Sequence, residues 1–200
     1  MQYREILDRI LNAVDQDAYL TPTHRIGGPE GQALAVFRQA MSAADWEPEA
    51  VRGLLLRMHD EGRLRRVTYL SALHIVAAHP KVGNWVEAAR LTGEQELAAL
   101  DEGGPDLSAN LASVDRHRGV IAFMKQHYEL ALDYFARALE RERTAENLGN
   151  ILCTLVRLHE IDEAASLLAQ IQASYPGPLV DELTDIIERD PDLALLRAES

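Results

Sequence analysis

Residues 111–176 have the sequence LASVDRHRGVIAFMKQHYELALDYFARALERERTAENLGNILCTLVRLHEIDEAASLLAQIQASYP. Apolar residues recur in this stretch at intervals of three and four, which is the period of an amphipathic helix. A turn is expected at Gln126-His127-Tyr128, and Tyr175-Pro176 ends the last helical pattern. The spacing therefore predicts two consecutive helix-turn-helix units of nearly equal length.

Small and large residues alternate within these two units at related positions. Gly119 is followed twelve residues later by Ala131, and then by Phe135 and Ala138. Ala164 lies 33 residues after Ala131. Small residues allow two antiparallel helices to approach closely, and a large side chain fills the space beside them. This pattern indicates helical hairpins that pack in the same way twice.

The pattern resembles the tetratricopeptide repeat, whose period is about 34 residues. The resemblance implies an all-α fold in which antiparallel helical hairpins stack as a short right-handed solenoid. The units are expected at about residues 67–100, 111–143 and 144–176, the first of them degenerate. An N-terminal helical region (1–66) precedes them and capping helices (178–198) follow, and all of these are expected to form one folded unit. An ordinary pair of helical hairpins would show a similar pattern and remains the alternative.

In this family the first helix of each unit lines a concave face that binds other proteins. The resemblance therefore implies a non-enzymatic interaction module, an adaptor, scaffold or chaperone-like protein, that binds a peptide or helix of a partner protein in a groove. Alignment through Ala131 and Ala164 places seven residues on this face or at its edge: Arg116, Val120, Phe123, Met124, Asn150, Cys153 and Arg157.

Charge is distributed unevenly along the chain. The net charge is −12, of which −2 belongs to residues 1–100 and −10 to residues 101–200. An acidic surface repels phosphate backbones and favours basic partners or simple solvation. Nucleic acid is thus a disfavoured partner. The alternative function, a nucleic-acid-binding regulator, would depend on the five arginines of segment 52–66: Arg52, Arg57, Arg63, Arg65 and Arg66.

The sequence contains no recognisable catalytic motif. It has no nucleophile elbow, no phosphate-binding glycine loop and no His-Glu-x-x-His pair. His74 with His79, and His159 with Glu163, are pairs at close spacing, but a metal site needs three or four ligands. Cys153 is the single cysteine, which excludes an internal disulfide. We therefore expect neither an enzyme nor a cofactor.

Several elements outside the repeats can also be predicted. Helical periodicity is present at 3–16, from Leu34 to Met41 and from Pro48 onward, and a connector rich in glycine and proline is expected at 21–29. No run of 18 apolar residues occurs, so we expect no membrane insertion and a cytoplasmic location. The tail around Leu195 is expected either to dock back on the repeats or to wait for a partner. A homodimer is compatible with these features.

Overall fold

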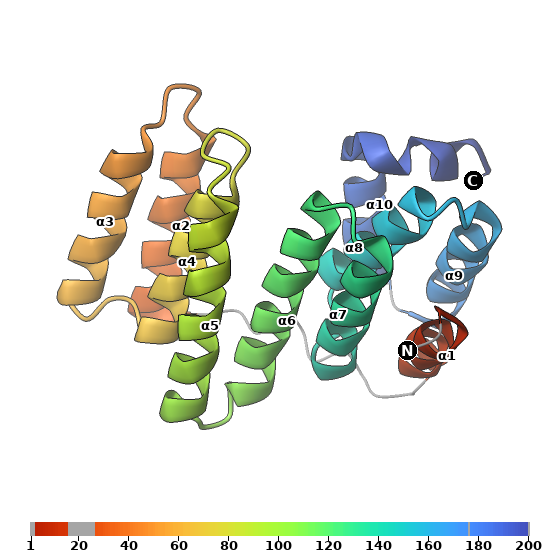
Figure 1. Cartoon of the computed structure of the whole chain (residues 1–200), viewed down its shortest axis with the longest axis horizontal. Coiled ribbons are helices and arrows are strands. Elements are labelled where there is room, and N and C mark those ends of the chain that lie inside the picture. Colours follow the sequence, from red (N-terminus) through yellow and green to blue (C-terminus); the bar gives the residue numbers. More distant parts are fainter. Residues whose placement is uncertain (1–2, 16–26, 176, 200) are drawn as a thin grey trace. The chain divides into compact units, whose positions relative to one another are not determined.

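The computed structural model describes residues 3–15, 27–175 and 177–199, and within these ranges every regular element is helical. The all-α prediction is confirmed for these residues (Figure 1). The elements are α1 (Tyr3–Asp15), α2 (Gly28–Ser42), α3 (Pro48–Asp60), α4 (Arg66–Ala78), α5 (Trp85–Glu102), α6 (Leu107–Met124), α7 (Tyr128–Arg141), α8 (Ala145–Arg157), α9 (Ile161–Ser174), α10 (Gly177–Arg189) and the 3₁₀ helix η1 (Pro191–Glu199).

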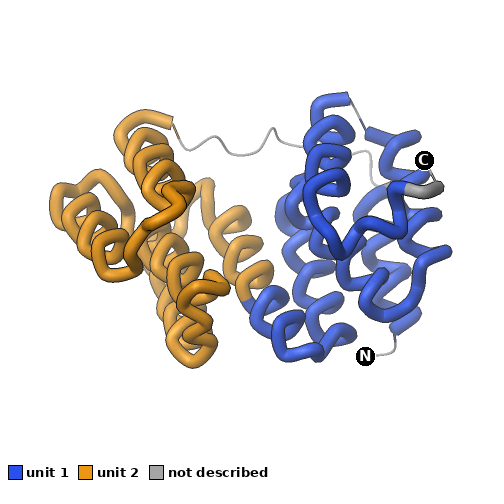
Figure 2. The backbone as a smooth tube through the Cα atoms, turned by 90° about the horizontal axis from the view of Figure 1, so that it is seen from above, with its two compact units in different colours: residues 1–23, 118–200 blue, residues 24–117 orange. Residues whose placement is uncertain are grey.

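The chain divides into two compact units (Figure 2). Unit 1 comprises residues 1–23 and 118–200, and unit 2 comprises residues 24–117. The division falls inside α6, whereas the sequence interpretation placed the end of the N-terminal region at residue 66. Unit 2 is therefore inserted between α1 and the remainder of unit 1.

Unit 1 contains the end of α6 and the helices α7, α8 and α9, which cover most of the two expected hairpins. The core of this unit is mainly apolar, and the largest side chains of α8, which include Ile151, Leu152 and Leu155, are fully buried. A Cβ atom added to Gly119 would overlap the ring of Phe135, which is 1% exposed. The small residue at position 119 is thus what lets α7 pack against α6.

The turns after α6 and α8 have the same backbone geometry. Gln126 and His159 have positive φ angles of 61° and 66°. In both turns this residue donates its N–H to the carbonyl three residues earlier, and the next N–H bonds to the carbonyl five residues earlier. The two positions are 33 residues apart, which is also the separation of Ala131 and Ala164. The sequence period therefore corresponds to a repeated local structure.

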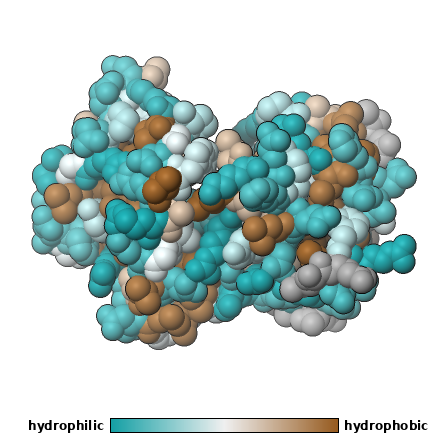
Figure 3. All heavy atoms as spheres, viewed as in Figure 1, coloured by the Kyte–Doolittle hydropathy of each residue, from teal (hydrophilic) through white to brown (hydrophobic). Residues whose placement is uncertain are grey.

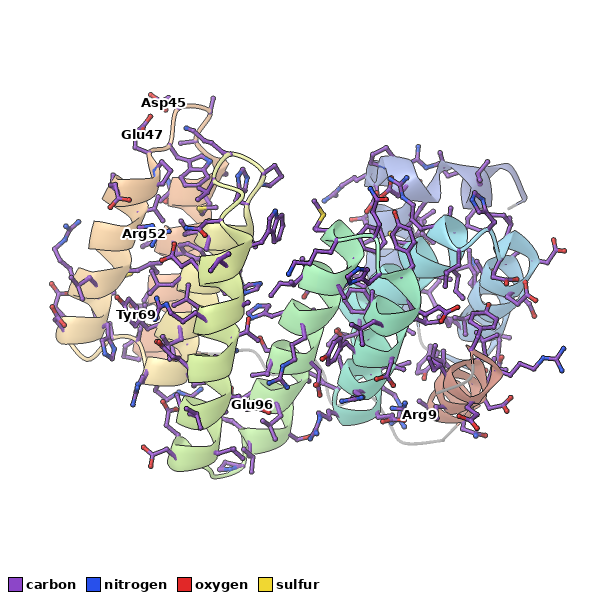
Figure 4. The ribbon with its side chains drawn as sticks, viewed as in Figure 1. Arg9, Asp45, Glu47, Arg52, Tyr69 and Glu96 are labelled. Carbon is purple, nitrogen blue, oxygen red and sulfur yellow. The ribbon has the colours of Figure 1, made fainter. Side chains whose placement is uncertain are left out.

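Helix α1 completes unit 1 from the other end of the chain. It packs against α7 and α9, and the side chains of Ile6 and Ile10 are buried there. Arg9, labelled in Figure 4, donates hydrogen bonds to Asp133 at 2.8 Å and to Glu140 at 2.7 Å. These contacts span more than 120 residues of sequence, which no local pattern could predict.

Two boundaries differ from the sequence interpretation. Helix α2 begins at Gly28, with proline in its first turn, so the connector expected at 21–29 does not extend that far; residues 21–26 lie outside the described ranges. The sequence also predicts that the repeats are interrupted from Thr92 to Ser108, but the break is confined to residues 103–106, because α5 continues to Glu102.

Candidate partner-binding face

The seven predicted groove residues lie on α6 and α8. Arg116 is in the part of α6 that belongs to unit 2, and the other six residues belong to unit 1. Within unit 1, α6 contributes Val120, Phe123 and Met124, and α8 contributes the remaining three. We call these six residues the α6–α8 face.

The part of the face on α6 is apolar and partly exposed. Val120 and Phe123 are half-buried and pack against the core of unit 1. The Phe123 ring lies edge-on to Tyr128, with a centroid separation of 5.3 Å. Met124 is 49% exposed. A flexible thioether beside an aromatic ring is adaptable apolar surface, which suits contact with another chain.

The part of the face on α8 is polar, and two of its residues bond to the chain's own C-terminal segment. Cys153 is buried, and its Sγ donates to Asp190 Oδ2 at 3.5 Å. Burial, together with the nearby Asp190 carboxylate, raises the pKa of the Cys153 thiol well above its usual value. The thiol is therefore protonated and a poor nucleophile. Arg157 donates to Asp192 Oδ1 at 2.5 Å.

The C-terminal segment, residues 190–197, is held against α8, α9 and α10. Leu193 and Leu196 are 0% and 1% exposed, whereas Leu195 is 58% exposed. The guanidinium of Arg197 donates to the carbonyl oxygens of Ile187 and Asp190. Of the two outcomes expected for this tail, the structure has the first, because the segment docks back on the preceding helices.

The arginines of segment 52–66 are largely engaged with carboxylates. Arg52, labelled in Figure 4, donates two hydrogen bonds to Glu87, at 2.7 and 2.9 Å, and these bonds are the main reason that the pKa of Arg52 is raised. Arg65 bonds to Glu30 and to Asp106. Two of the segment's exposed arginines, Arg57 and Arg66, have no carboxylate partner among the described residues. This arrangement neutralises much of the basic cluster that nucleic acid would need.

Unit 2 contains a buried polar cluster that sequence reasoning missed. His74 and His117 stack with ring centroids 3.7 Å apart. Gln95 Oε1 lies 2.8 Å from His117 Nδ1, and Thr92 Oγ1 lies 3.0 Å from His74 Nδ1. Burial lowers the pKa of both histidines, that of His74 to about 4, and the charge of Arg116 adds to this effect. Both rings are thus neutral at pH 7.

The described residues include no group of three or more histidine, cysteine, aspartate or glutamate side chains that could hold a metal ion. No helix in the described ranges is long and apolar enough to cross a membrane. No protein-family model matches the chain, and neither the curated proteins nor the solved structures include a significant match. The resemblance to tetratricopeptide repeats therefore stays a prediction.

Proposed function

We propose that this protein is a non-enzymatic interaction module of the tetratricopeptide type that binds a short helical or extended segment of a partner protein on the α6–α8 face. The observation that carries the proposal is that the protein's own C-terminal segment binds to α8. There Arg157 and Cys153 bond to Asp192 and Asp190, and Leu193 and Leu196 are buried. A surface that accommodates an acidic, leucine-containing segment of its own chain has the chemistry to hold a similar segment of another.

The repeated turns at Gln126 and His159 and the close fit of Gly119 to Phe135 support the stacked-hairpin arrangement that such a module requires. The pairing of Arg52 and Arg65 with carboxylates makes nucleic acid a poor second candidate. Cys153 is a buried, protonated thiol and therefore suits a contact residue better than a catalytic one.

A photo-crosslinking amino acid at position 124 tests the location of the site. Met124 is exposed and belongs to the face, so the labelled protein should crosslink a partner in native cell extract. The same label at Leu130, an exposed position on α7, is the matched control. Equal crosslinking of one partner from both positions would place the binding surface elsewhere.

Substitution of the C-terminal segment tests whether the tail competes with the partner. Asp192→Arg replaces the acceptor of Arg157 with a like charge and should release the segment, which would increase partner capture. Asp185→Arg on α10, where the Asp185–Arg189 pair is highly exposed, is the control. Combined Phe123→Ala and Arg157→Ala should reduce capture. Unchanged capture by both Asp192→Arg and the double variant would contradict the proposal.

A further inference from the structure

Helix α5 carries an exposed apolar stripe that no other part of unit 2 covers. Val86, Leu97 and Leu100 are 85%, 68% and 57% exposed. Together with Ala89 and Gly93 they lie on one face of the helix, because positions separated by three, four and seven residues point in the same direction. Hydrophobic side chains gather at the lower end of α5 in Figure 3. Contiguous exposed apolar residues of this kind usually mark an interaction surface.

Gly93 stands at the centre of this stripe although glycine destabilises a helix interior. A Cβ atom added to Gly93 would have nothing within 4 Å, so no contact within the chain explains the absence of a side chain. Replacing alanine by glycine at such a site costs about 1 kcal/mol. A second helix that crosses α5 at this point would give the glycine a role, because it would let the two backbones approach closely.

The stripe is symmetric about Gly93. Val86 lies seven residues before it and Leu100 seven after, while Ala89 lies four before and Leu97 four after. If two copies of α5 packed antiparallel about a two-fold axis at Gly93, Val86 would face Leu100 of the second copy. Ala89 would face Leu97 of the second copy. Ala89 would then oppose a large residue, and the two Gly93 residues would meet at the axis, where the two backbones could approach closely.

The charges beside the stripe suit the same arrangement. Arg90 and Glu94 lie on one flank of the stripe and form an ion pair within α5. In an antiparallel pair the same flanks of both helices adjoin, so Arg90 would also lie near Glu94 of the second copy, and the reverse. Glu96, labelled in Figure 4, lies on the other flank. The Arg90 flank of the contact would therefore hold two Arg90–Glu94 attractions, which outnumber the one Glu94–Glu94 repulsion at the axis.

We infer that the exposed face of α5 is a homodimer interface in which two copies of α5 pack antiparallel across a two-fold axis at Gly93. The inference does not depend on the proposed function, which concerns unit 1. A single pair of 18-residue helices buries little surface, so the dimer belongs to the weak class of interfaces below about 1,200 Å² in total. It forms and dissociates with protein concentration.

Sedimentation velocity of the full chain over a range of concentrations tests this inference. The wild-type protein should show a reversible monomer–dimer equilibrium, and Leu97→Glu should weaken it roughly tenfold or more, since an unpaired charge would be buried. Leu56→Glu on α3, where the leucine is 47% exposed, is the control and should leave the equilibrium unchanged. A protein that stays monomeric at all concentrations, or a dimer that both variants weaken equally, would overturn the inference.

A charge exchange tests the geometry without relying on a hydrophobic change. Arg90→Glu and Glu94→Arg should each weaken self-association, because each places like charges at both Arg90–Glu94 contacts. An equimolar mixture of the two variants should regain dimers, since every contact in the mixed dimer then joins opposite charges. A mixture that associates no better than the separate variants would exclude the antiparallel pairing at Gly93.

Discussion

The two units differ in what fills the spaces between their helices. In unit 1 Gly119 and Phe135 make a close helix contact, and α8 buries mostly apolar side chains. In unit 2 the space between α4, α5 and α6 holds His74, Thr92, Gln95 and His117. The stability of unit 1 thus depends on close packing of apolar side chains. That of unit 2 also depends on the protonation state of two histidines.

Acidification should produce the largest difference in stability between the two units, because it should destabilise unit 2 much more than unit 1. Because burial lowers the pKa of His74 from 6.5 to about 4, the unfolded chain takes up a proton before the folded chain does. The contribution of His74 is therefore complete above pH ~6.5 and is lost as the pH falls toward 4, a loss of about 3 kcal/mol. His117, whose pKa is lowered in the same direction, adds to it.

Hydrogen exchange followed by mass spectrometry at pH 7 and pH 4.5, with rates corrected for intrinsic exchange, measures this difference. Amides of α4 and α5 should lose protection, and those of α8 should lose much less. A matched His117→Phe variant, which keeps an aromatic ring beside His74, should reduce the pH dependence. Equal loss of protection in both units would show that the histidine pair does not control the stability of unit 2.

A Gly→Ala substitution should change the free energy of unfolding in opposite directions in the two units. At Gly119 the new Cβ overlaps the buried Phe135 ring, so we expect a loss of about 2 kcal/mol. At Gly93 the Cβ meets nothing, and the helix should gain about 0.5–1 kcal/mol. Urea denaturation at low protein concentration measures both, and two changes of the same sign would contradict this account of the packing.

Ala131→Leu is a second probe of fit in unit 1. Ala131 is 0% exposed in the core between α7 and its neighbours, so the added volume should destabilise the protein by about 1–3 kcal/mol. Thermal unfolding measures this loss. A wild-type melting temperature would mean that the repeat alignment through Ala131 does not identify a close helix crossing.

The same contrast explains which parts of the fold could be predicted from the sequence. Unit 1 hairpins were found because their buried positions are apolar and recur with the helical period, and Thr144 caps α8 by accepting the N–H of Asn147. The sequence predicts an interruption at Thr92 within α5 because two buried positions in the second half of this helix, Thr92 and Gln95, are polar. A pattern search treats such positions as exposed, although they complete the histidine cluster.

The candidate site was predictable only in part. The residues of α6 and α8 follow from the repeat period, which the turns at Gln126 and His159 reproduce. The position of the C-terminal segment on α8 does not follow from the repeat period, since it depends on contacts such as Arg157–Asp192 that join residues 35 positions apart. The docking of α1 through Arg9 is a still longer-range example of the same limit.

Arg9→Ala should produce a moderate loss of stability that is confined to unit 1. The Arg9 side chain is 28% exposed and binds two carboxylates, one of which, Asp133, is 8% exposed. Loss of these charge-assisted bonds should cost about 1–2 kcal/mol. Arg137→Ala removes the other arginine that bonds to Asp133 but leaves α1 attached, so it is the control. Hydrogen exchange of α1 should increase in the first variant only.

Arg157→Ala should have the smallest effect on global stability, because the Arg157 side chain is 47% exposed and such ion pairs contribute about 0–1 kcal/mol. The local effect should be larger. Without this bond the C-terminal segment is held by its leucines and by Arg197, so the amides of residues 191–197 should exchange several-fold faster while the melting temperature stays within about 1 °C. Arg189→Ala removes an equally simple but more exposed pair with Asp185 and should change neither quantity. If Arg157→Ala leaves the exchange of the segment unchanged, the ion pair does not hold the tail on α8, and an increase in partner capture by Asp192→Arg would then need another cause.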